Sequence, residues 1–122
     1  MIAERKPTRL IFPADGMKLV LDRRQRATGR NPTNDYGYTG DTIPFYDVSG
    51  SVLGSVLIEE QKVVPFNELT ASDIALLGSN SRSEYAMRWN RAYGKLLGYA
   101  KDNPLVLLIR FRVIANFKES EK

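Results

Sequence analysis

The amino-acid sequence of 122 residues contains no cysteine and no histidine. Without cysteine the chain has no disulfide, no zinc–thiolate site and no thiol nucleophile. Without histidine it lacks both the imidazole metal ligand and the most frequent general base of enzymes. Any catalysis would therefore depend on lysine, arginine, carboxylates or hydroxyl groups, and we expect neither a metal ion nor a cofactor.

The sequence also lacks a long apolar run and an opening signal-peptide pattern. A membrane-spanning helix needs about 20 consecutive apolar residues, so we expect a cytoplasmic protein with no membrane contact. Hydrophobic residues make up 43% of the chain and charged residues 26%, which is typical of one globular domain. We expect a single domain over residues 1–122, frayed at 1–7 and 117–122, and we favour a monomer.

Positive charge is concentrated near the start of the chain. The net charge is +4, and residues 1–30 hold eight lysines and arginines against three acids. Four of these arginines fall within eight residues: Arg23, Arg24, Arg26 and Arg30. Clustered positive charge attracts polyanions and accelerates their encounter with the protein. The cluster therefore favours nucleic acids and nucleotides as partners.

No regular helix or strand pattern covers residues 29–40, which we interpret as a long loop containing Tyr36 and Tyr38. Guanidinium groups in such a loop can hold phosphates, and tyrosine rings can stack on bases. The alternative is a solvated basic loop whose tyrosines only shape turns. The residues alone give the two interpretations even weight.

Hydrophobic periodicity and capping residues predict the remaining elements. We expect strands at 8–12, 42–48, 52–64 and 105–113, and helices at 16–26, 73–77 and 81–93. The second and third strands would form a hairpin. The first helix would end in Arg23, Arg24 and Arg26, which would suit the negative end of a helix dipole without any ligand. Gly94 is in position to end the last helix.

The last helix carries two stripes. Tyr85, Trp89 and Tyr93 recur every four residues, and core packing is the expected role of Trp89 and Tyr85. Arg88 and Arg91 lie on an adjacent basic stripe, which matters for binding only if the fold brings it near the arginine cluster. Together with a last strand that has one fully apolar face, these elements predict an α+β fold: a small mixed β-barrel with two or three helices packed against it.

This order of elements, together with certain residues, resembles the ASCH domain family of the PUA-like superfold. That family has a loop motif of the form GxKxxExR, a Gly-Asp pair entering the next strand and an apolar closing strand. The corresponding segments here are Arg23–Arg30, Gly40-Asp41 and Leu105–Val113 (LVLLIRFRV), with Tyr93 near the end of the helix. The resemblance covers nearly the whole chain and implies a PUA-like barrel.

The family pattern is only partly retained. Of the four motif positions Arg30 alone is kept, since Arg23, Gln25 and Thr28 stand at the glycine, lysine and acid positions. Relatives that hydrolyse acetylcytidine also carry threonine there, together with a lysine and a later glutamate, but the region Leu77–Asn80 offers no carboxylate. Among the activities assigned to the family are RNA binding, single-stranded RNA cleavage and amide hydrolysis. RNA binding fits these departures best, and Thr28 is the one weak catalytic candidate.

The sequence therefore predicts a basic, tyrosine-containing cleft that binds RNA or a nucleotide or nucleoside. Arginines would hold phosphate, tyrosines would stack on a base, and Asn34 or Asp41 would read a base edge. One alternative is a metal-independent ribonuclease or nucleoside amidohydrolase, and another is a basic module that binds an acidic protein. The predicted binding residues are Arg24, Arg26, Thr28, Arg30, Asn34, Tyr36, Tyr38, Asp41, Arg88 and Arg91.

Overall fold

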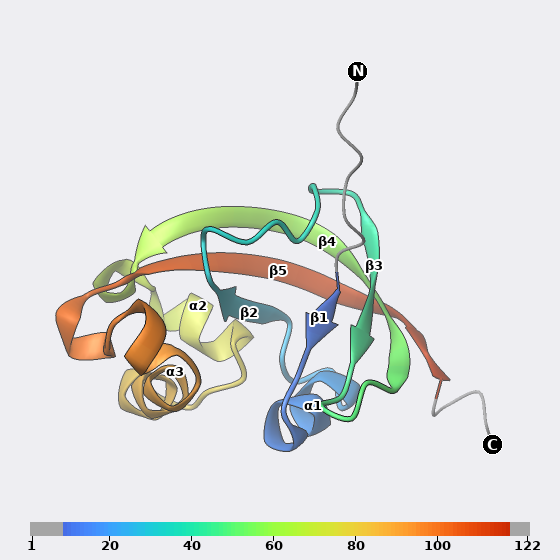
Figure 1. Cartoon of the computed structure of the whole chain (residues 1–122), viewed down its shortest axis with the longest axis horizontal. Coiled ribbons are helices and arrows are strands. Elements are labelled where there is room, and N and C mark those ends of the chain that lie inside the picture. Colours follow the sequence, from blue (N-terminus) through green and yellow to red (C-terminus); the bar gives the residue numbers. More distant parts are fainter. Residues whose placement is uncertain (1–8, 118–122) are drawn as a thin grey trace.

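A computed structural model describes residues 9–117 as a curled five-stranded sheet with three α-helices packed on it (Figure 1). The elements are β1 (Leu10–Ile11), α1 (Ala14–Leu21), β2 (Ala27–Arg30), β3 (Thr42–Tyr46), β4 (Val52–Pro65), α2 (Ala71–Leu76), α3 (Arg82–Leu97) and β5 (Leu105–Asn116). The expected frayed ends at 1–7 and 118–122 lie outside the described residues, whereas Phe117 is described.

The sheet is mixed, and its strand order is β1-β3-β4-β5-β2. Only β1 and β3 run parallel, and the other neighbours are antiparallel. The long strands β4 and β5 arch over the helices, with α1 near one end of the sheet and α2 and α3 near the other (Figure 1). The result is a half-barrel with helices, which confirms the predicted α+β class and the β3–β4 hairpin.

Strand β5 lies between two hydrophobic clusters. Leu107, Ile109 and Phe111 pack in one cluster, which includes α1. Val106 and Leu108, on the opposite face, pack in the other cluster, which includes α2 and α3. Because successive side chains of a strand point to opposite faces, one strand can hold both clusters together. This confirms the predicted apolar face of the strand and shows that the first half of its other face is buried too.

Helix α1 is shorter than predicted, because it ends at Leu21 rather than near residue 26. Arg23 has a φ of 57°, and the backbone N–H groups of Arg24 and Gln25 both donate to the carbonyl of Leu19. The left-handed residue turns the chain away from the helix axis and lets Gln25 become buried. The prediction that three arginines occupy the last helical turn is therefore wrong.

The predicted loop from residue 29 is wrong at its beginning, since Gly29 and Arg30 belong to β2. All four residues of β2 are buried, and they pair with β5 in the register Ala27↔Arg110 to Arg30↔Leu107. A strand covered on both faces shows no alternation of apolar and polar residues. Its short sequence therefore carries no strand signal, and the pairing with a distant strand decides its conformation.

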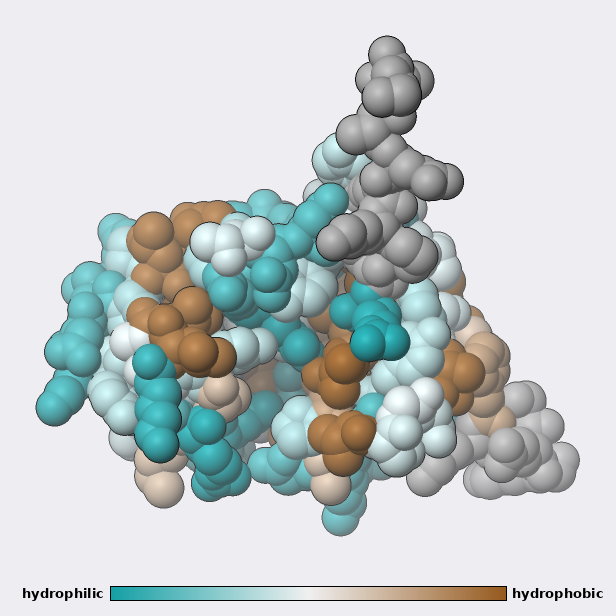
Figure 2. Space-filling model, viewed as in Figure 1, coloured by the Kyte–Doolittle hydropathy of each residue, from teal (hydrophilic) through white to brown (hydrophobic). Residues whose placement is uncertain are grey.

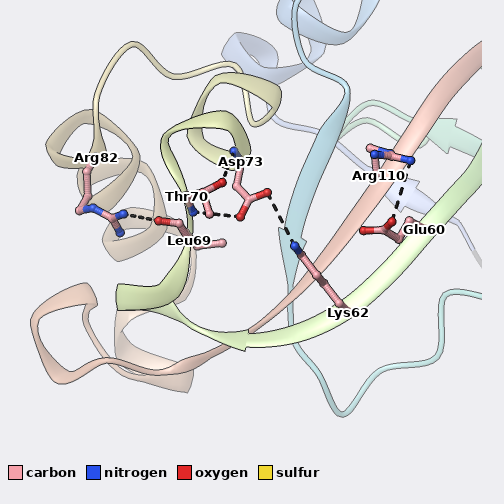
Figure 3. A network of polar contacts seen from close by, with 7 residues as sticks. All are labelled: Glu60, Lys62, Leu69, Thr70, Asp73, Arg82 and Arg110. Carbon is pink, nitrogen blue, oxygen red and sulfur yellow. Dashed lines mark hydrogen bonds and ion pairs between the residues drawn. The ribbon is translucent and has the colours of Figure 1, made fainter.

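Helix α2 begins with a capping box, in which the Thr70 side chain accepts from the Asp73 N–H and the Asp73 side chain accepts from the Thr70 N–H. Figure 3 shows the Lys62 side chain of β4 reaching towards the Asp73 carboxylate, at 3.9 Å. Arg82, the first residue of α3, donates to the carbonyl of Leu69. These contacts join α2 to the sheet, and the segment just before α2 to α3.

Helix α3 is longer than predicted, because it continues through Gly94 and ends before Gly98. A Cβ atom at position 94 would approach the ring of Tyr99 more closely than real Cβ atoms do. Gly94 therefore allows the chain after the helix to fold back onto it, whereas Gly98, with a φ of 107°, ends the helix. Within residues 9–117, no helix combines the length and apolar character needed to cross a membrane.

Candidate functional site

A pocket of about 440 Å³ lies between α3 and the segment that joins β1 to α1. Figure 2 shows the surface hollowed between these two parts of the molecule. Strand β2 contributes Thr28, Gly29 and Arg30 to its lining, and α3 contributes Tyr85, Arg88, Trp89, Arg91, Ala92 and Tyr93. The pocket is thus lined by residues from the arginine cluster and from both stripes of α3.

Arg30 is buried in this pocket, with 9% of its surface exposed. Its Nε donates to the Thr28 hydroxyl at 2.9 Å, and its guanidinium carbon lies 4.9 Å from the centroid of the Phe12 ring. Within residues 9–117, no carboxylate forms an ion pair with Arg30. Burying a charge without a counter-charge is costly, so the position is suited to an anion that enters the pocket.

Arg88 is fixed in the pocket wall by uncharged groups. Its Nη1 donates to the Leu77 carbonyl at 2.8 Å and to the Ser79 hydroxyl at 2.7 Å. Its Nη2 donates to the amide oxygen of Gln25 at 3.1 Å. These partners orient the guanidinium without neutralising it. Arg88 therefore adds a second, preorganised positive charge to the pocket.

The remaining charged lining residues, Arg91 and Asp15, face each other across 3.8 Å. Both side chains are mostly exposed, and exposed ion pairs of this kind contribute little to stability. Three arginines and one aspartate thus give the described lining an excess of two positive charges.

Aromatic rings form the wall on the α3 side. Trp89 is 2% exposed and donates from Nε1 to the Gly98 carbonyl at 2.9 Å; Tyr85 is 5% exposed. Their predicted core positions are therefore confirmed. The ring of Tyr93 is only half-buried and lies 4.8 Å from the Trp89 ring, centroid to centroid.

Burial raises the pKa of the Tyr85 phenol, although the nearby positive charges of Arg88 and Arg30 oppose the rise. Burial likewise raises the pKa of Tyr93, again opposed by Arg30. Removing a phenol from water disfavours its charged form. Both hydroxyl groups are therefore neutral near pH 7 and able to donate hydrogen bonds.

Four of the predicted binding residues meet in the pocket: Thr28, Arg30, Arg88 and Arg91. The basic stripe of α3 and the end of the arginine cluster thus share one concave surface. Six predicted residues do not line it, namely Arg24, Arg26, Asn34, Tyr36, Tyr38 and Asp41.

The loop residues lie around the pocket rather than in it. Asn34 donates from Nδ2 to the Tyr36 hydroxyl at 3.2 Å. Tyr36 in turn lies close enough to Tyr93 to contribute to the raised pKa of Tyr93. The Asp41 carboxylate accepts from the backbone N–H of Tyr38 at 2.8 Å, and the Tyr38 ring is 66% exposed. These contacts put Tyr36 near the pocket and leave the Tyr38 ring on the surface.

Gln25, which stands where relatives have a lysine, is a structural part of the site. Its amide is buried, with Nε2 donating to the Ala27 carbonyl at 3.0 Å and Oε1 accepting from Arg88. Both ends of the amide are therefore already in hydrogen bonds, and the described lining residues include neither a lysine nor a glutamate. Among residues 9–117 no cluster of acidic side chains is suited to a metal ion.

Sequence reasoning missed Gly29 and the polar ends of Gln25 and Tyr85. A signal for Tyr85 existed, because it places a hydroxyl on a stripe otherwise expected to pack in the core. Gln25 stood at a motif position, but nothing in the sequence indicated its contact with Arg88, and Gly29 carried no signal. Their roles depend on α3 lying across β2, which no local pattern indicates.

Comparison with known proteins identifies the fold. No family model and no curated protein matches the sequence. The ASCH domain from Lactobacillus crispatus JV V101 superposes with a TM-score of 0.71 at 13% identity, covering 89% of this chain and 81% of that one. Protein EF3133 from Enterococcus faecalis V583, of the DUF984 family, gives 0.67 at 17% identity, with 94% and 84% covered.

An ASCH protein from Zymomonas mobilis is a further match, with a TM-score of 0.64 at 15% identity and with 91% of this chain and 70% of that one covered. Identities this low establish the fold alone. The chain has an ASCH-domain fold of the PUA-like kind, as its sequence resemblance predicts.

Proposed function

We propose that this ASCH-fold domain binds single-stranded RNA or a nucleotide, with one nucleotide unit held in the pocket. The observation that carries the proposal is Arg30, a buried arginine without an acidic partner among residues 9–117. An anionic phosphate would supply the missing counter-charge. Charge-assisted hydrogen bonds to phosphate are among the stronger polar contacts in proteins, and the planar guanidinium group matches phosphate geometry.

The rest of the pocket supports the same ligand. A volume of about 440 Å³ is within the range of small-molecule sites. Arg88 also lines the pocket and is held by neutral groups. The half-buried ring of Tyr93 offers a face for a base, and stacking of this kind contributes about 1–3 kcal/mol per base. The Thr28 hydroxyl, which accepts from Arg30, can still donate its own proton to the ligand.

Residues outside the pocket extend the proposal to a longer strand. Arg24 and Arg26 are exposed and would contact phosphates of neighbouring nucleotides. Tyr36 and Tyr38 would stack on further bases, and Asn34 or Asp41 would contact base edges. Because contacts to phosphates release counterions, such binding depends steeply on salt.

The test is fluorescence anisotropy with a short, labelled single-stranded RNA at two salt concentrations. Arg30→Ala is expected to weaken binding about ten- to a hundredfold, the equivalent of one charge-assisted hydrogen-bonded contact. Arg112→Ala is the matched control, because Arg112 is an exposed arginine of β5 that does not line the pocket.

Replacing Arg24 and Arg26 together is expected to reduce the salt dependence for the oligonucleotide and to leave binding of a mononucleotide unchanged. The absence of binding to both ligands at low salt would contradict the proposal and favour the protein-binding alternative.

A further inference from the structure

The hydroxyl group of Tyr85 has no hydrogen-bond partner in the part of the chain that the structure describes. The ring stacks on Phe66, at 5.8 Å between centroids, and lies 5.8 Å from the guanidinium carbon of Arg88. These are its polar and aromatic contacts within residues 9–117. Tyr85 is nevertheless 5% exposed and lines the pocket. Among the described residues, no side-chain oxygen or nitrogen is both fully buried and without a hydrogen-bond partner, so the Tyr85 hydroxyl still reaches the open space of the pocket. It can therefore donate a hydrogen bond to a ligand that enters there.

The floor of the pocket, formed by three residues, is largely covered by the rest of the protein. Thr28, Arg30 and Tyr85 are each at most 9% exposed. An internal phosphodiester has a sugar on both sides and would need space for the chain to enter and leave. A terminal group carries a nucleotide on one side only. The floor therefore suits the end of a ligand.

The charge of the pocket distinguishes between kinds of phosphate. Three arginines and one aspartate among the described lining residues leave an excess of two positive charges, and Asp15 is already paired with Arg91 at 3.8 Å. Arg30 and Arg88 are thus two guanidinium groups without a carboxylate partner among residues 9–117. A phosphate monoester carries a charge of about −1.5 to −2 at pH 7, whereas a diester carries a single negative charge.

From these three observations we infer that the pocket floor binds a terminal phosphate monoester. Arg30 and Arg88 hold its negative charge, and the Tyr85 hydroxyl donates a hydrogen bond to one of its oxygens. The inference rests on the proposed nucleotide-binding function and makes it narrower: the preferred ligand is a nucleoside monophosphate or a phosphorylated RNA end rather than an internal stretch of RNA.

The experiment compares ligands that differ only at their ends. One short RNA is prepared with a 5′-phosphate, with a 3′-phosphate or with hydroxyl groups at both ends, and a nucleoside 5′-monophosphate is compared with its nucleoside. Isothermal titration calorimetry is expected to show at least tenfold tighter binding of a phosphorylated ligand than of its unphosphorylated counterpart. The oligonucleotide pair identifies an RNA end as ligand, and the mononucleotide pair identifies a free nucleotide.

Tyr85→Phe tests the hydroxyl itself, because it keeps the ring that stacks on Phe66. The variant is expected to lose most of the preference for phosphorylated ligands, because its affinity for phosphorylated RNA should fall much more than its affinity for unphosphorylated RNA. A purely structural role for the hydroxyl would change both affinities together or neither.

A pH series adds an independent measurement. The second ionisation of a phosphate monoester has a pKa of about 6, so binding of the monophosphate should strengthen between pH 5 and pH 7.5. The ionisable groups that face the site are Arg30, Arg88, Arg91, Asp15, Tyr85 and Tyr93. The methyl phosphodiester of the same nucleotide is the control, because it has no second ionisation. Any pH dependence of its binding therefore comes from the ionisable groups of the protein.

Two results would contradict the inference in different ways. Equal, Arg30-dependent binding of phosphorylated and unphosphorylated RNA would exclude the terminal phosphate site and leave the proposed RNA binding intact. No binding of any of these ligands would overturn both.

Discussion

The phenolic oxygen of Tyr85 occupies the space that a side chain at position 29 would need. A Cβ atom added to Gly29 would lie well under 3.0 Å from this oxygen, a separation that real Cβ atoms essentially never show. Glycine therefore allows α3 to approach β2 closely enough to put a hydroxyl on the pocket floor. The depth of the pocket depends on this pair of residues.

Replacing Gly29 by alanine should displace the Tyr85 hydroxyl and destabilise the fold. Overpacking of this kind typically costs about 1–3 kcal/mol. Combining Gly29→Ala with Tyr85→Phe removes the clashing oxygen, so the double variant should be more stable than the sum of the single changes predicts. Urea denaturation of the four proteins measures this coupling. Additive effects would show that the two residues do not interact.

The buried charge of Arg30 should lower the free energy of unfolding, although the same charge is needed for binding. Arg30→Met replaces a buried charge by a shorter, unbranched apolar side chain, and replacing buried charges by apolar groups is often neutral or stabilising. We expect an unfolding free energy equal to or above that of the wild type, together with loss of RNA binding. Thermal denaturation and anisotropy on the same samples test both parts. A clear loss of stability would show that the Phe12 and Thr28 contacts outweigh the cost of burial.

Four of the ten predicted binding residues line the pocket, but their arrangement could not be predicted. Arg30 could be identified because it stands in a dense arginine cluster, and Trp89 because its stripe repeats at helical spacing. Both signals are local. That Arg24 and Arg26 lie outside the pocket could not be predicted, because the helix ends early at a left-handed Arg23.

The strand conformation of β2 could not be predicted from the local sequence either. Its buried residues owe their conformation to pairing with β5, nearly eighty residues later. The close approach of Tyr85 to Gly29 follows from that pairing and from the packing of α3 across the strand. Long-range contacts of this kind override short-range propensity.

Trp89 should be the main anchor of α3. It is 2% exposed and contacts both Phe66 and Tyr93. Trp89→Ala is expected to reduce the unfolding free energy by about 3–5 kcal/mol, a large part of the stability of a domain this size. Met87→Ala is the control on the same helix, since Met87 is 65% exposed. Chemical denaturation should leave the control within about 0.5 kcal/mol of the wild type.

The chain should not hydrolyse acetylcytidine by a lysine–threonine–glutamate route. The Gln25 amide is neutral, and both its ends are in hydrogen bonds, so it cannot exchange a proton near neutral pH. Acetate release at high protein concentration is the assay, with nucleotide binding by the same sample as the control for an intact site. Turnover that disappears in Thr28→Ala would place the chain among the hydrolases.

The most direct test of the central claim is a nuclear magnetic resonance titration of the arginine and tryptophan side chains with a nucleoside monophosphate. If the ligand binds in the pocket, the Nε–H signals of Arg30 and Arg88 and the indole N–H of Trp89 should shift together and saturate with one affinity. The Nε–H signal of the exposed Arg112 should stay in place. Shifts confined to Arg24, Arg26 and Arg112, with Arg30 unchanged, would contradict the account and assign binding to the outer surface.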